Sequence, residues 1–233
     1  LGKDLIARKL AARVIGIVRR PEAVQECLSA EAVHTATLDL SAIASADVVV
    51  LAAPVATIVR QMTDIAPYVR PDAVVTDMGS TKGAIVQAGE SALGGRFVGG
   101  HPMTGSEKTG YQNSYALLLE NAYYILTPTV NTPEWMTRLL YQLVEGMGSI
   151  PIILEAEEHD RITAAISHVP HIIAAQLVNL IRNSDDEAEK MRSLAAGGFK
   201  DITRIASSSP VMWQNICLTN AEDIKIMLDE YIR

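Results

Sequence analysis

The chain has 233 residues, of which 48% are hydrophobic, so it can bury one large core or two modest ones. Its formal net charge of -7 and its scattered Lys and Arg residues argue against a nucleic-acid partner, which requires a basic stripe facing the phosphates. The two cysteines, Cys27 and Cys217, stand far apart and outside any CxxC pattern, which argues against a disulfide framework or a zinc site and fits a reducing, cytoplasmic location.

The chain opens on a predicted helix and strand. Residues 1–12 look like the helix that follows a glycine-rich loop, and residues 13–18, RVIGIV, predict the second strand of a dinucleotide-binding fold. The fingerprint GxGxxG that should follow the first strand does not occur, so we expect the first strand and its glycines to be missing. A complete enzyme needs that loop, because a close backbone approach lets a pyrophosphate reach the helix N-terminus.

The strand at 13–18 ends in Val18, Arg19 and Arg20, at the position that distinguishes NAD from NADP. An NAD site usually places Asp or Glu here to bind the ribose 2′-hydroxyl, whereas a nearby Arg can accommodate a 2′-phosphate. The alternative is that the arginines merely cap a solvated turn. The pattern leaves NAD and NADP both open and leans towards NADP, with Arg19 and Arg20 as cofactor-binding residues.

Five further apolar runs alternate with helical segments in the first part of the chain. They cover residues 46–55, 72–80, 94–103, 121–129 and 149–156, and the stretch 54–69 between two of them has helical spacing. Nearly all-apolar strands are typical of a parallel, doubly wound sheet with helices on both faces. Residues 1–156 are therefore predicted to form an α/β, Rossmann-type dinucleotide-binding domain.

Ligands of such a sheet bind beyond the carboxyl ends of its strands. Ala53 and Pro54 follow one strand and are expected to contact the cofactor. Ser80, in the stretch DMGSTKG (77–83), opens the next helix, where free N–H groups and the helix dipole favour a polar or anionic ligand. The alternative is that Ser80 or Thr81 simply caps that helix.

A histidine follows another strand at a rigid, polar turn. The stretch GGHPMTGSEKTG (99–110) places His101 between two glycines and a proline, with Ser106 and Glu107 shortly after it. Because this strand belongs to the same sheet, we expect His101 at the same ligand-binding edge as Ser80.

The strand patterns stop near residue 157, and residues 157–233 are predicted to form a second, all-helical domain. No apolar run approaches the roughly 18 to 20 residues that span a bilayer, and no signal peptide opens the chain. We therefore expect no membrane partner.

Three of the five histidines lie in the first helix of this domain, at His159, His168 and His171. Pro170 should kink or break the helix. A metal site is disfavoured, because His159 and His171 are about 120° apart on a regular helix and no HExxH pattern occurs. Each histidine singly suits a satisfied core position, but three in an Ala-, Ile- and Val-rich helix favour a polar pocket.

The stretch 195–213, AAGGFKDITRIASSSPVMW, predicts a helix break at its glycines and a fresh helix with Pro210 in its first turn. Trp213 needs burial in a domain with few aromatic residues, and a partner subunit could provide it. A homodimer is therefore expected.

Taken together, five segments resemble one family, the prephenate and arogenate dehydrogenases of tyrosine biosynthesis. In chain order they are DMGSTKG, GGHPMTGSEKTG, NAYYILTP, ISHVPHIIA and GGFKDITRIASSSPVMW. The resemblance implies an NAD- or NADP-dependent oxidative decarboxylation, in which hydride leaves the ring carbon that bears the hydroxyl and CO₂ departs as the ring aromatises. It implies prephenate as the substrate, with arogenate as the alternative substrate. A second alternative is that the protein is an inactive cofactor-binding or regulatory relative of these enzymes.

The resemblance also implies roles for the residues of the sheet domain. His101 matches the catalytic base that accepts the proton of the ring hydroxyl, a task that suits a neutral imidazole. Ser80 matches the serine that orients this histidine and the hydroxyl. Ser106 and Glu107 match positions that line or gate the substrate pocket.

In the helical domain the resemblance implies a substrate-binding set. Arg204 matches the arginine that binds the ring-side carboxylate of the dianionic substrate, and a guanidinium suits this because it can bind a carboxylate in a bidentate fashion. His171 matches a histidine that assists substrate binding, and His159 matches a position with a supporting role. Trp213 matches a residue that reaches the pocket from the other subunit.

Overall fold

The computed structural model describes residues 1–105 and 115–233. Within these residues the chain forms two compact units, Leu1–His159 and Asp160–Arg233. The expected domain boundary after residue 156 falls in the first turn of helix α6 (Ala156–Thr163), which carries the chain from one unit into the other.

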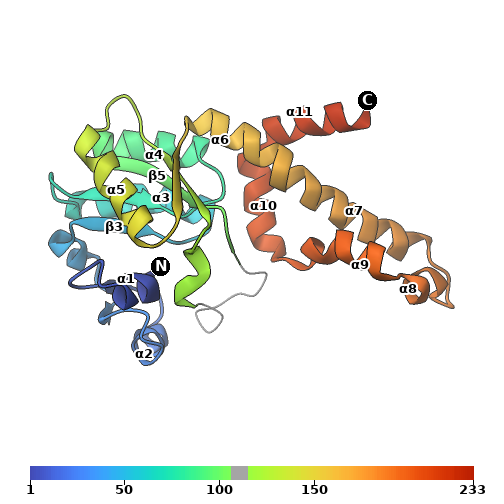
Figure 1. The fold of residues 1–233 in the computed structure, drawn as a ribbon, viewed down its shortest axis with the longest axis horizontal. Helices are drawn as coiled ribbons and strands as arrows, with labels where there is room; N and C mark the ends of the chain where they lie inside the picture. Colours follow the sequence, from blue (N-terminus) through green and yellow to red (C-terminus); the bar gives the residue numbers. More distant parts are fainter. Residues whose placement is uncertain (106–114) are drawn as a thin grey trace. The chain divides into compact units, whose positions relative to one another are not determined.

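The first unit is an α/β domain built on a five-stranded sheet, which confirms the predicted fold class (Figure 1). The strands hydrogen-bond in the order β3 (Val48–Leu51), β4 (Val74–Asp77), β5 (Phe97–Pro102), β6 (Tyr123–Thr127) and β7 (Ile150–Ile153). Each lies in one of the predicted apolar runs. Neighbouring strands are parallel except β5 and β6, which are antiparallel, so the expectation of an all-parallel sheet is wrong at this pair.

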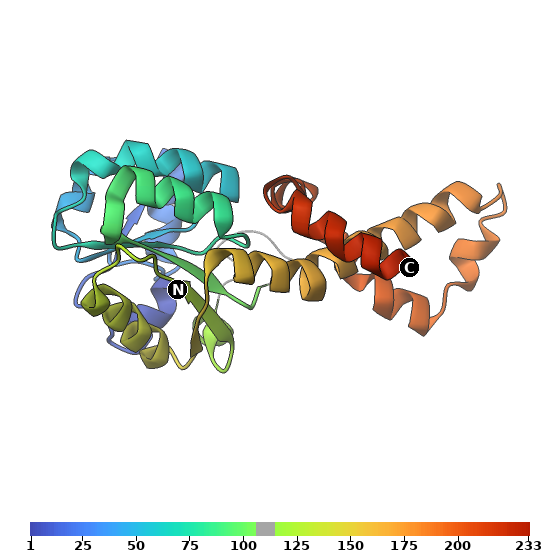
Figure 2. The ribbon, with the colours of Figure 1, turned by 90° about the horizontal axis from the view of Figure 1, so that it is seen from above.

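Helices cover both faces of this sheet, as the apolar strands predict. Helices α3 (Val55–Ile65) and α4 (Gly83–Leu93) bury their apolar sides on one face, and α1 (Gly2–Ala7) and α5 (Glu134–Gly146) bury theirs on the other (Figure 2). Strand β4 is buried on both faces, because Val75 belongs to the first core and its neighbour Val74 to the second. The 3-10 segments of this unit are Leu40–Ser45, Ala66–Tyr68, Gly94–Arg96 and Ala116–Leu119.

A small second sheet accompanies the large one. It pairs β1 (Ile15–Ile17) with β2 (Thr35–Thr37) in parallel, joined through helix α2 (Pro21–Ser29). In the described residues, β1 pairs only with β2 and β3 only with β4, so each has one edge without a strand partner. In a doubly wound dinucleotide-binding sheet, the first strand lies between the strands that β1 and β3 represent.

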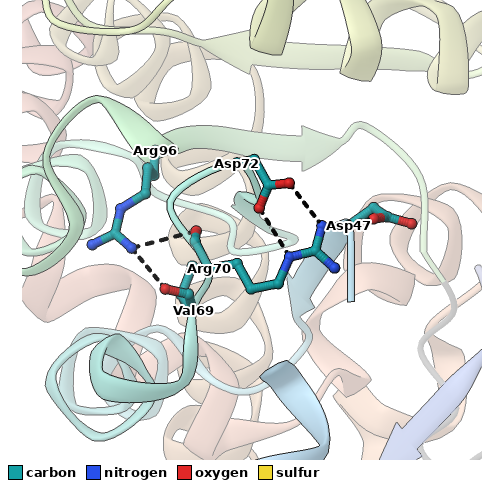
Figure 3. A network of polar contacts seen from close by, with 5 residues as sticks. All are labelled: Asp47, Val69, Arg70, Asp72 and Arg96. Atoms are coloured by element: carbon teal, nitrogen blue, oxygen red, sulfur yellow. Dashed lines mark hydrogen bonds and ion pairs between the residues drawn. The ribbon is translucent and has the colours of Figure 1, made fainter. Parts of the chain in front are cut away.

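Charged side chains fasten the amino ends of the central strands (Figure 3). Arg70 bonds Asp47, just before β3, at 3.0 Å and Asp72, just before β4, at 2.9 Å. Arg96, just before β5, donates to the carbonyl oxygen of Val69 at 2.8 Å. These contacts join the amino ends of the strands, which is the edge of the sheet opposite to the carboxyl ends where ligands of such folds bind.

The second unit consists of helices, as predicted, and Figure 1 shows them. They are α7 (Val169–Ser184), α8 (Lys190–Leu194), α9 (Gly197–Thr203), α10 (Pro210–Thr219) and α11 (Ala221–Ile232), with a 3-10 turn at Arg204–Ser207. Helix α10 begins at Pro210 as expected, and Ser209 caps it by accepting from the Met212 N–H.

A π turn, Ala164–His168, joins α6 to α7 without a break. It stands where Pro170 was expected to kink or break the helix. A proline removes one backbone donor and crowds the preceding turn, and one wider turn accommodates both effects. Such a turn inserts one residue, which shifts the phase of the residues after it by about 100°, so angles worked out for a regular helix do not hold across it.

The continuous helix Ala156–Ser184 is long and apolar enough to cross a membrane by length and composition, with 29 residues and an 18-residue window whose mean hydropathy is 1.4. This corrects the expectation that no run approaches that length. A single helix of this kind is weak evidence for a membrane segment, because the core helix of a soluble protein passes the same test.

Candidate active site

The loop after β4 carries Ser80 at the carboxyl edge of the sheet. Strand β4 ends at Asp77, and α4 begins at Gly83 with Lys82 as its N-cap residue and no side-chain cap. The N-cap residue of this helix is therefore Lys82 and neither Ser80 nor Thr81. Ser80 lies half-buried in the connection itself, directly after Gly79, whose N–H donates to Asp77 Oδ2 at 2.7 Å.

A buried ion pair lies beneath this loop. The Lys82 ammonium contacts the Asp77 carboxylate, and both side chains are 0% exposed. The same ammonium donates to the carbonyl oxygen of Gly100 at 2.7 Å, and Asp77 Oδ1 accepts the Gly100 N–H at 2.9 Å. The sequence suggested that the residues opening α4 face an anion, but Lys82 faces the interior of the domain and compensates Asp77.

His101 lies near the end of β5 and pairs with a second histidine. Its Nδ1 is 2.8 Å from Nε2 of His159, and the two rings meet edge to face with centroids 5.0 Å apart. His159, on α6, is 0% exposed, whereas His101 is half-buried. The structure thus brings together two of the predicted site residues within the first unit.

This contact selects the tautomers of both rings, because only one of the two facing nitrogens can carry the hydrogen. A neutral His101 can accept a proton at Nε2 only if its own proton lies on Nδ1. In that arrangement His101 Nδ1–H donates to His159 Nε2, and the neutral His159 keeps its proton on Nδ1. The buried ring then orients His101 and leaves Nε2 as the basic atom.

The residues expected to contact the cofactor lie at strand ends. Arg19 and Arg20 directly follow β1 and are exposed, and Arg20 pairs with Glu26 at 3.4 Å. Ala53 and Pro54 follow β3, and Pro54 is the N-cap residue of α3. The exposed guanidinium groups at the end of β1 can form hydrogen bonds with hydroxyl or phosphate groups.

In the second unit, His171 and Trp213 form a parallel stack. Their ring centroids are 3.5 Å apart with planes 5° from parallel, and His171 is buried. Burial lowers the pKa of His171 because it penalises the imidazolium, while a hydrogen bond with the backbone of Ile205 opposes the shift. The exposed indole from which a partner subunit was inferred is not what the structure shows, because Trp213 is half-buried against His171 of its own chain.

Two polar atoms of this stack lack hydrogen-bond partners. They are His171 Nδ1 and Trp213 Nε1, both buried among the described residues. Buried nitrogens of this kind are rare in folded proteins, because an unmade hydrogen bond costs about 1–3 kcal/mol. A ligand oxygen would satisfy the Trp213 N–H, and a ligand hydroxyl would satisfy His171 Nδ1, because the other ring nitrogen of His171 bonds the backbone of Ile205.

His168 has a different environment from its two neighbours. It is buried, its Nδ1 is 3.1 Å from the side-chain nitrogen of Asn220, and its ring meets Trp213 edge to face. Asn220 also donates to the carbonyl oxygen of Asp160 at 2.8 Å. This histidine therefore links the first helix of the unit to the start of α11.

The remaining predicted residues are placed as follows. Arg204 begins the 3-10 turn after α9 and is exposed. Ser106 and Glu107 lie outside the described residues. In the described ranges no group of three or more His, Cys, Asp or Glu side chains could hold a metal ion.

Comparison with known proteins covers nearly the whole chain. Residues 1–152 match the family model "Prephenate dehydrogenase, nucleotide-binding domain", and residues 155–233 match "Prephenate dehydrogenase, dimerization domain". The chain is 41% identical to a prephenate dehydrogenase of Bacillus subtilis over 197 residues, which are 83% of this chain and 53% of the relative. The chain thus spans about half the length of this relative and of a similar prephenate dehydrogenase of Lactococcus lactis.

Two solved structures are similar over almost the full chain. The prephenate dehydrogenase of A. aeolicus, in complex with hydroxyphenyl propionate and NAD+, has a TM-score of 0.93 and 33% identity, with 99% of this chain and 81% of that chain covered. The arogenate dehydrogenase of Synechocystis has a TM-score of 0.85 and 28% identity, with 99% and 82% covered.

Proposed function

The chain belongs to the prephenate dehydrogenase family, and on that premise we propose that it catalyses the oxidative decarboxylation of prephenate to 4-hydroxyphenylpyruvate. The observation that carries this proposal is the pair formed by His101 and His159, which leaves one imidazole nitrogen of a half-buried histidine as a base at the edge of the sheet. Relatives named for prephenate and for arogenate both match, and the higher identity to the Bacillus subtilis enzyme favours prephenate.

His101 acts as the catalytic base. The C–H bond at the hydroxyl-bearing ring carbon breaks with its electrons as hydride, and the hydroxyl proton passes to His101 Nε2. The bond to the ring carboxylate then breaks, CO₂ leaves, and its electrons aromatise the ring and reach the oxygen, which takes the proton back from His101 to give the phenol. A base at this position contributes about 10²- to 10⁴-fold, because it prevents positive charge from building on the oxygen.

Two residues support the base. His159 holds His101 in the tautomer with Nε2 unprotonated, by accepting the Nδ1–H of His101 across the 2.8 Å contact. Ser80, on the loop after β4, orients the substrate hydroxyl and His101. Ser106 and Glu107 line or gate the pocket in this proposal.

The helical unit supplies groups for the two carboxylates of the substrate. Arg204 is exposed and can form a bidentate contact with the ring carboxylate. The Trp213 Nε1–H, which lacks a partner, is a donor that a carboxylate oxygen of the substrate would satisfy, whereas Nδ1 of a neutral His171, whose other nitrogen bonds the backbone of Ile205, can accept a hydrogen bond from a hydroxyl. His171 in its neutral form suits this role, and its lowered pKa keeps it neutral near pH 7.

The proposed cofactor is NAD or NADP, and a bound nicotinamide supplies the hydride acceptor. The cofactor would be held at its ribose end and next to it by Arg19, Arg20, Ala53 and Pro54. The phosphate-binding glycine loop is not among the residues of this chain. Two consecutive arginines after β1, with no acidic residue beside them, lean towards NADP. The ratio of kcat/KM for the two cofactors, in the parent and in Arg19→Ala, tests this preference.

A homodimer completes the proposal. The second unit leaves large apolar side chains exposed, including Ile166, Leu194, Val211, Leu218 and Ile232. Burial of such side chains between two copies is typical of an obligate dimer with twofold symmetry. Light scattering at micromolar concentration should report twice the chain mass, and a monomer with full activity would contradict this assembly.

The activity itself is tested by supplying prephenate or arogenate with each cofactor. Reduced nicotinamide and CO₂ should appear in equal amounts and only when a cyclohexadienyl substrate is present. If the protein turned over arogenate and not prephenate, arogenate would be its substrate. A protein that binds the cofactor but turns over neither substrate would be the regulatory relative, and the proposed activity would fail.

A further inference from the structure

We propose that the buried pair of Asp77 and Lys82 is the device that positions the two catalytic loops relative to each other. This inference rests on the proposed function, because it concerns the residues that precede Ser80 and His101. Asp77 and Lys82 touch no reacting atom in this account, so both are positioning residues.

The pair is needed because the backbone pairing of β4 and β5 stops short of the site. Their register ends at Thr76↔Val98, and from Gly99 onward β5 pairs with β6 on its other side. In an antiparallel pair, alternate residues direct their N–H and C=O groups away from the partner strand. The N–H and C=O of Gly100 therefore face the position where β4 has already ended.

The side chains of Asp77 and Lys82 bind the backbone groups of Gly100 that a longer β4 would bind. Asp77 Oδ1 accepts the Gly100 N–H at 2.9 Å, and the Lys82 ammonium donates to the Gly100 carbonyl oxygen at 2.7 Å. The second carboxylate oxygen, Oδ2, accepts the Gly79 N–H at 2.7 Å. One ion pair thus fixes the residue directly before Ser80 and the residue directly before His101.

The glycines of both loops fit this reading. A Cβ atom on Gly100 would lie 2.5 Å from the Asp77 carbonyl oxygen, and one on Gly79 would lie 2.9 Å from Asp77 Oδ2. At Gly100 the clash is with backbone, so a side chain there would push the two strand ends apart and break these hydrogen bonds. At Gly79 the nearest atom is Ile85 Cδ1 at 2.5 Å, followed by the carboxylate of the pair, so a side chain there would displace one or both of them.

Burial makes the arrangement stiff. Both side chains are 0% exposed, so each charge depends on the other and on the glycine backbone groups for compensation. A movement of either loop would leave a buried charge with an unmade hydrogen bond. The separation of Ser80 and His101 is therefore held within narrow limits before any substrate binds.

The test removes both charges together. A single change would leave an uncompensated buried charge and could unfold the protein, whereas joint replacement by neutral residues is often tolerated. In the full-length protein, the double variant Asp77→Asn with Lys82→Met should fold cooperatively and bind the dinucleotide with parental affinity. Its kcat should fall about 100-fold with KM within threefold, because a displacement of about 1 Å in a catalytic group has this effect.

Arg96→Met is the matched control. Arg96 donates to the carbonyl oxygen of Leu93 and, on the segment before β4, to that of Val69, which Figure 3 shows, so it fastens the chain near the amino ends of the same two strands. Its loss should weaken the fold and leave kcat unchanged. If the folded double variant kept kcat within twofold of the parent, or if Arg96→Met lowered kcat equally, the positioning role would be refuted.

A second readout does not depend on turnover. The imidazole signals of His101 in an NMR titration, assigned by their loss in His101→Asn, should shift in the double variant and stay in place in Arg96→Met. If the parent turned over no substrate, the proposed function would fail while this measurement still decided the positioning role. Unchanged His101 signals in the folded double variant would overturn it.

Discussion

Replacement of His159 distinguishes a positioning role from substrate binding. The sequence placed this histidine among the substrate-binding residues, but its side chain is 0% exposed and its Nε2 lies 2.8 Å from His101 Nδ1. His159→Phe keeps the ring volume and removes the acceptor. Without that acceptor, His101 loses the bond that fixes its orientation and tautomer.

The size of the effect follows from that one hydrogen bond. A neutral hydrogen bond contributes about 0.5–1.5 kcal/mol net, and about 1.4 kcal/mol corresponds to a tenfold change. We therefore expect kcat of His159→Phe to fall about 2- to 10-fold, far less than on removal of the base itself. KM should remain within twofold, because the buried ring does not contact substrate.

Steady-state kinetics of the folded variants at saturating cofactor measure both constants. His159→Gln is the matched control, since its amide oxygen can accept from His101 Nδ1–H and should restore most of kcat. A rise in KM at parental kcat would return His159 to substrate binding and refute the reasoning. Equal losses in the Phe and Gln variants would show that the acceptor is not what matters.

Three further changes test the other assignments. His101→Asn should lower kcat about 10²- to 10⁴-fold with KM within a few fold, and near-normal turnover would remove it as the base. Arg204→Lys should raise the KM for substrate about tenfold or more, because a charge-assisted hydrogen bond contributes about 1.5–3 kcal/mol; an unchanged KM would place the carboxylate elsewhere. His171→Phe should reduce the loss of stability at acid pH. The folded pKa of His171 is lowered, so the unfolded chain takes up its proton first, and stability falls as pH drops below the ordinary histidine value of about 6.5. Thermal unfolding from neutral to acid pH measures this, and identical slopes in parent and variant would contradict it.

The strands of the sheet were predictable, whereas the pairing at their ends was not. Apolar runs located β3 to β7, because a strand buried on both faces must be apolar along its whole length. Strand β2, with the sequence Thr35–Thr37, was missed because three residues carry no periodicity. The reversal of β6 was also missed, since an apolar run does not reveal strand direction.

The position of Lys82 shows why the site was only partly predictable. A lysine two residues after Ser80, at the start of a helix, has the pattern of an anion-binding group, and the sequence alone could not show the direction of its side chain. Its partner lies five residues earlier at Asp77, and the second contact lies at Gly100 on another strand. The available signal was the recurrence of an acid, a lysine and paired glycines at two neighbouring strand ends, which indicates close backbone approach.

The three histidines of the helical stretch illustrate the same limit. Their spacing suggested one polar pocket, but their neighbours give each a different chemistry. His159 has an imidazole partner, His168 has the amide of Asn220, and His171 has the face of Trp213 and a nitrogen without a partner. Only His171 retains a buried polar atom that its own unit leaves unsatisfied, so it is the one whose hydrogen bonding a substrate would complete. Burial lowers the pKa of His171 and holds the ring neutral, and because its other nitrogen bonds the backbone of Ile205, Nδ1 is left to accept a hydrogen bond from a hydroxyl of the substrate.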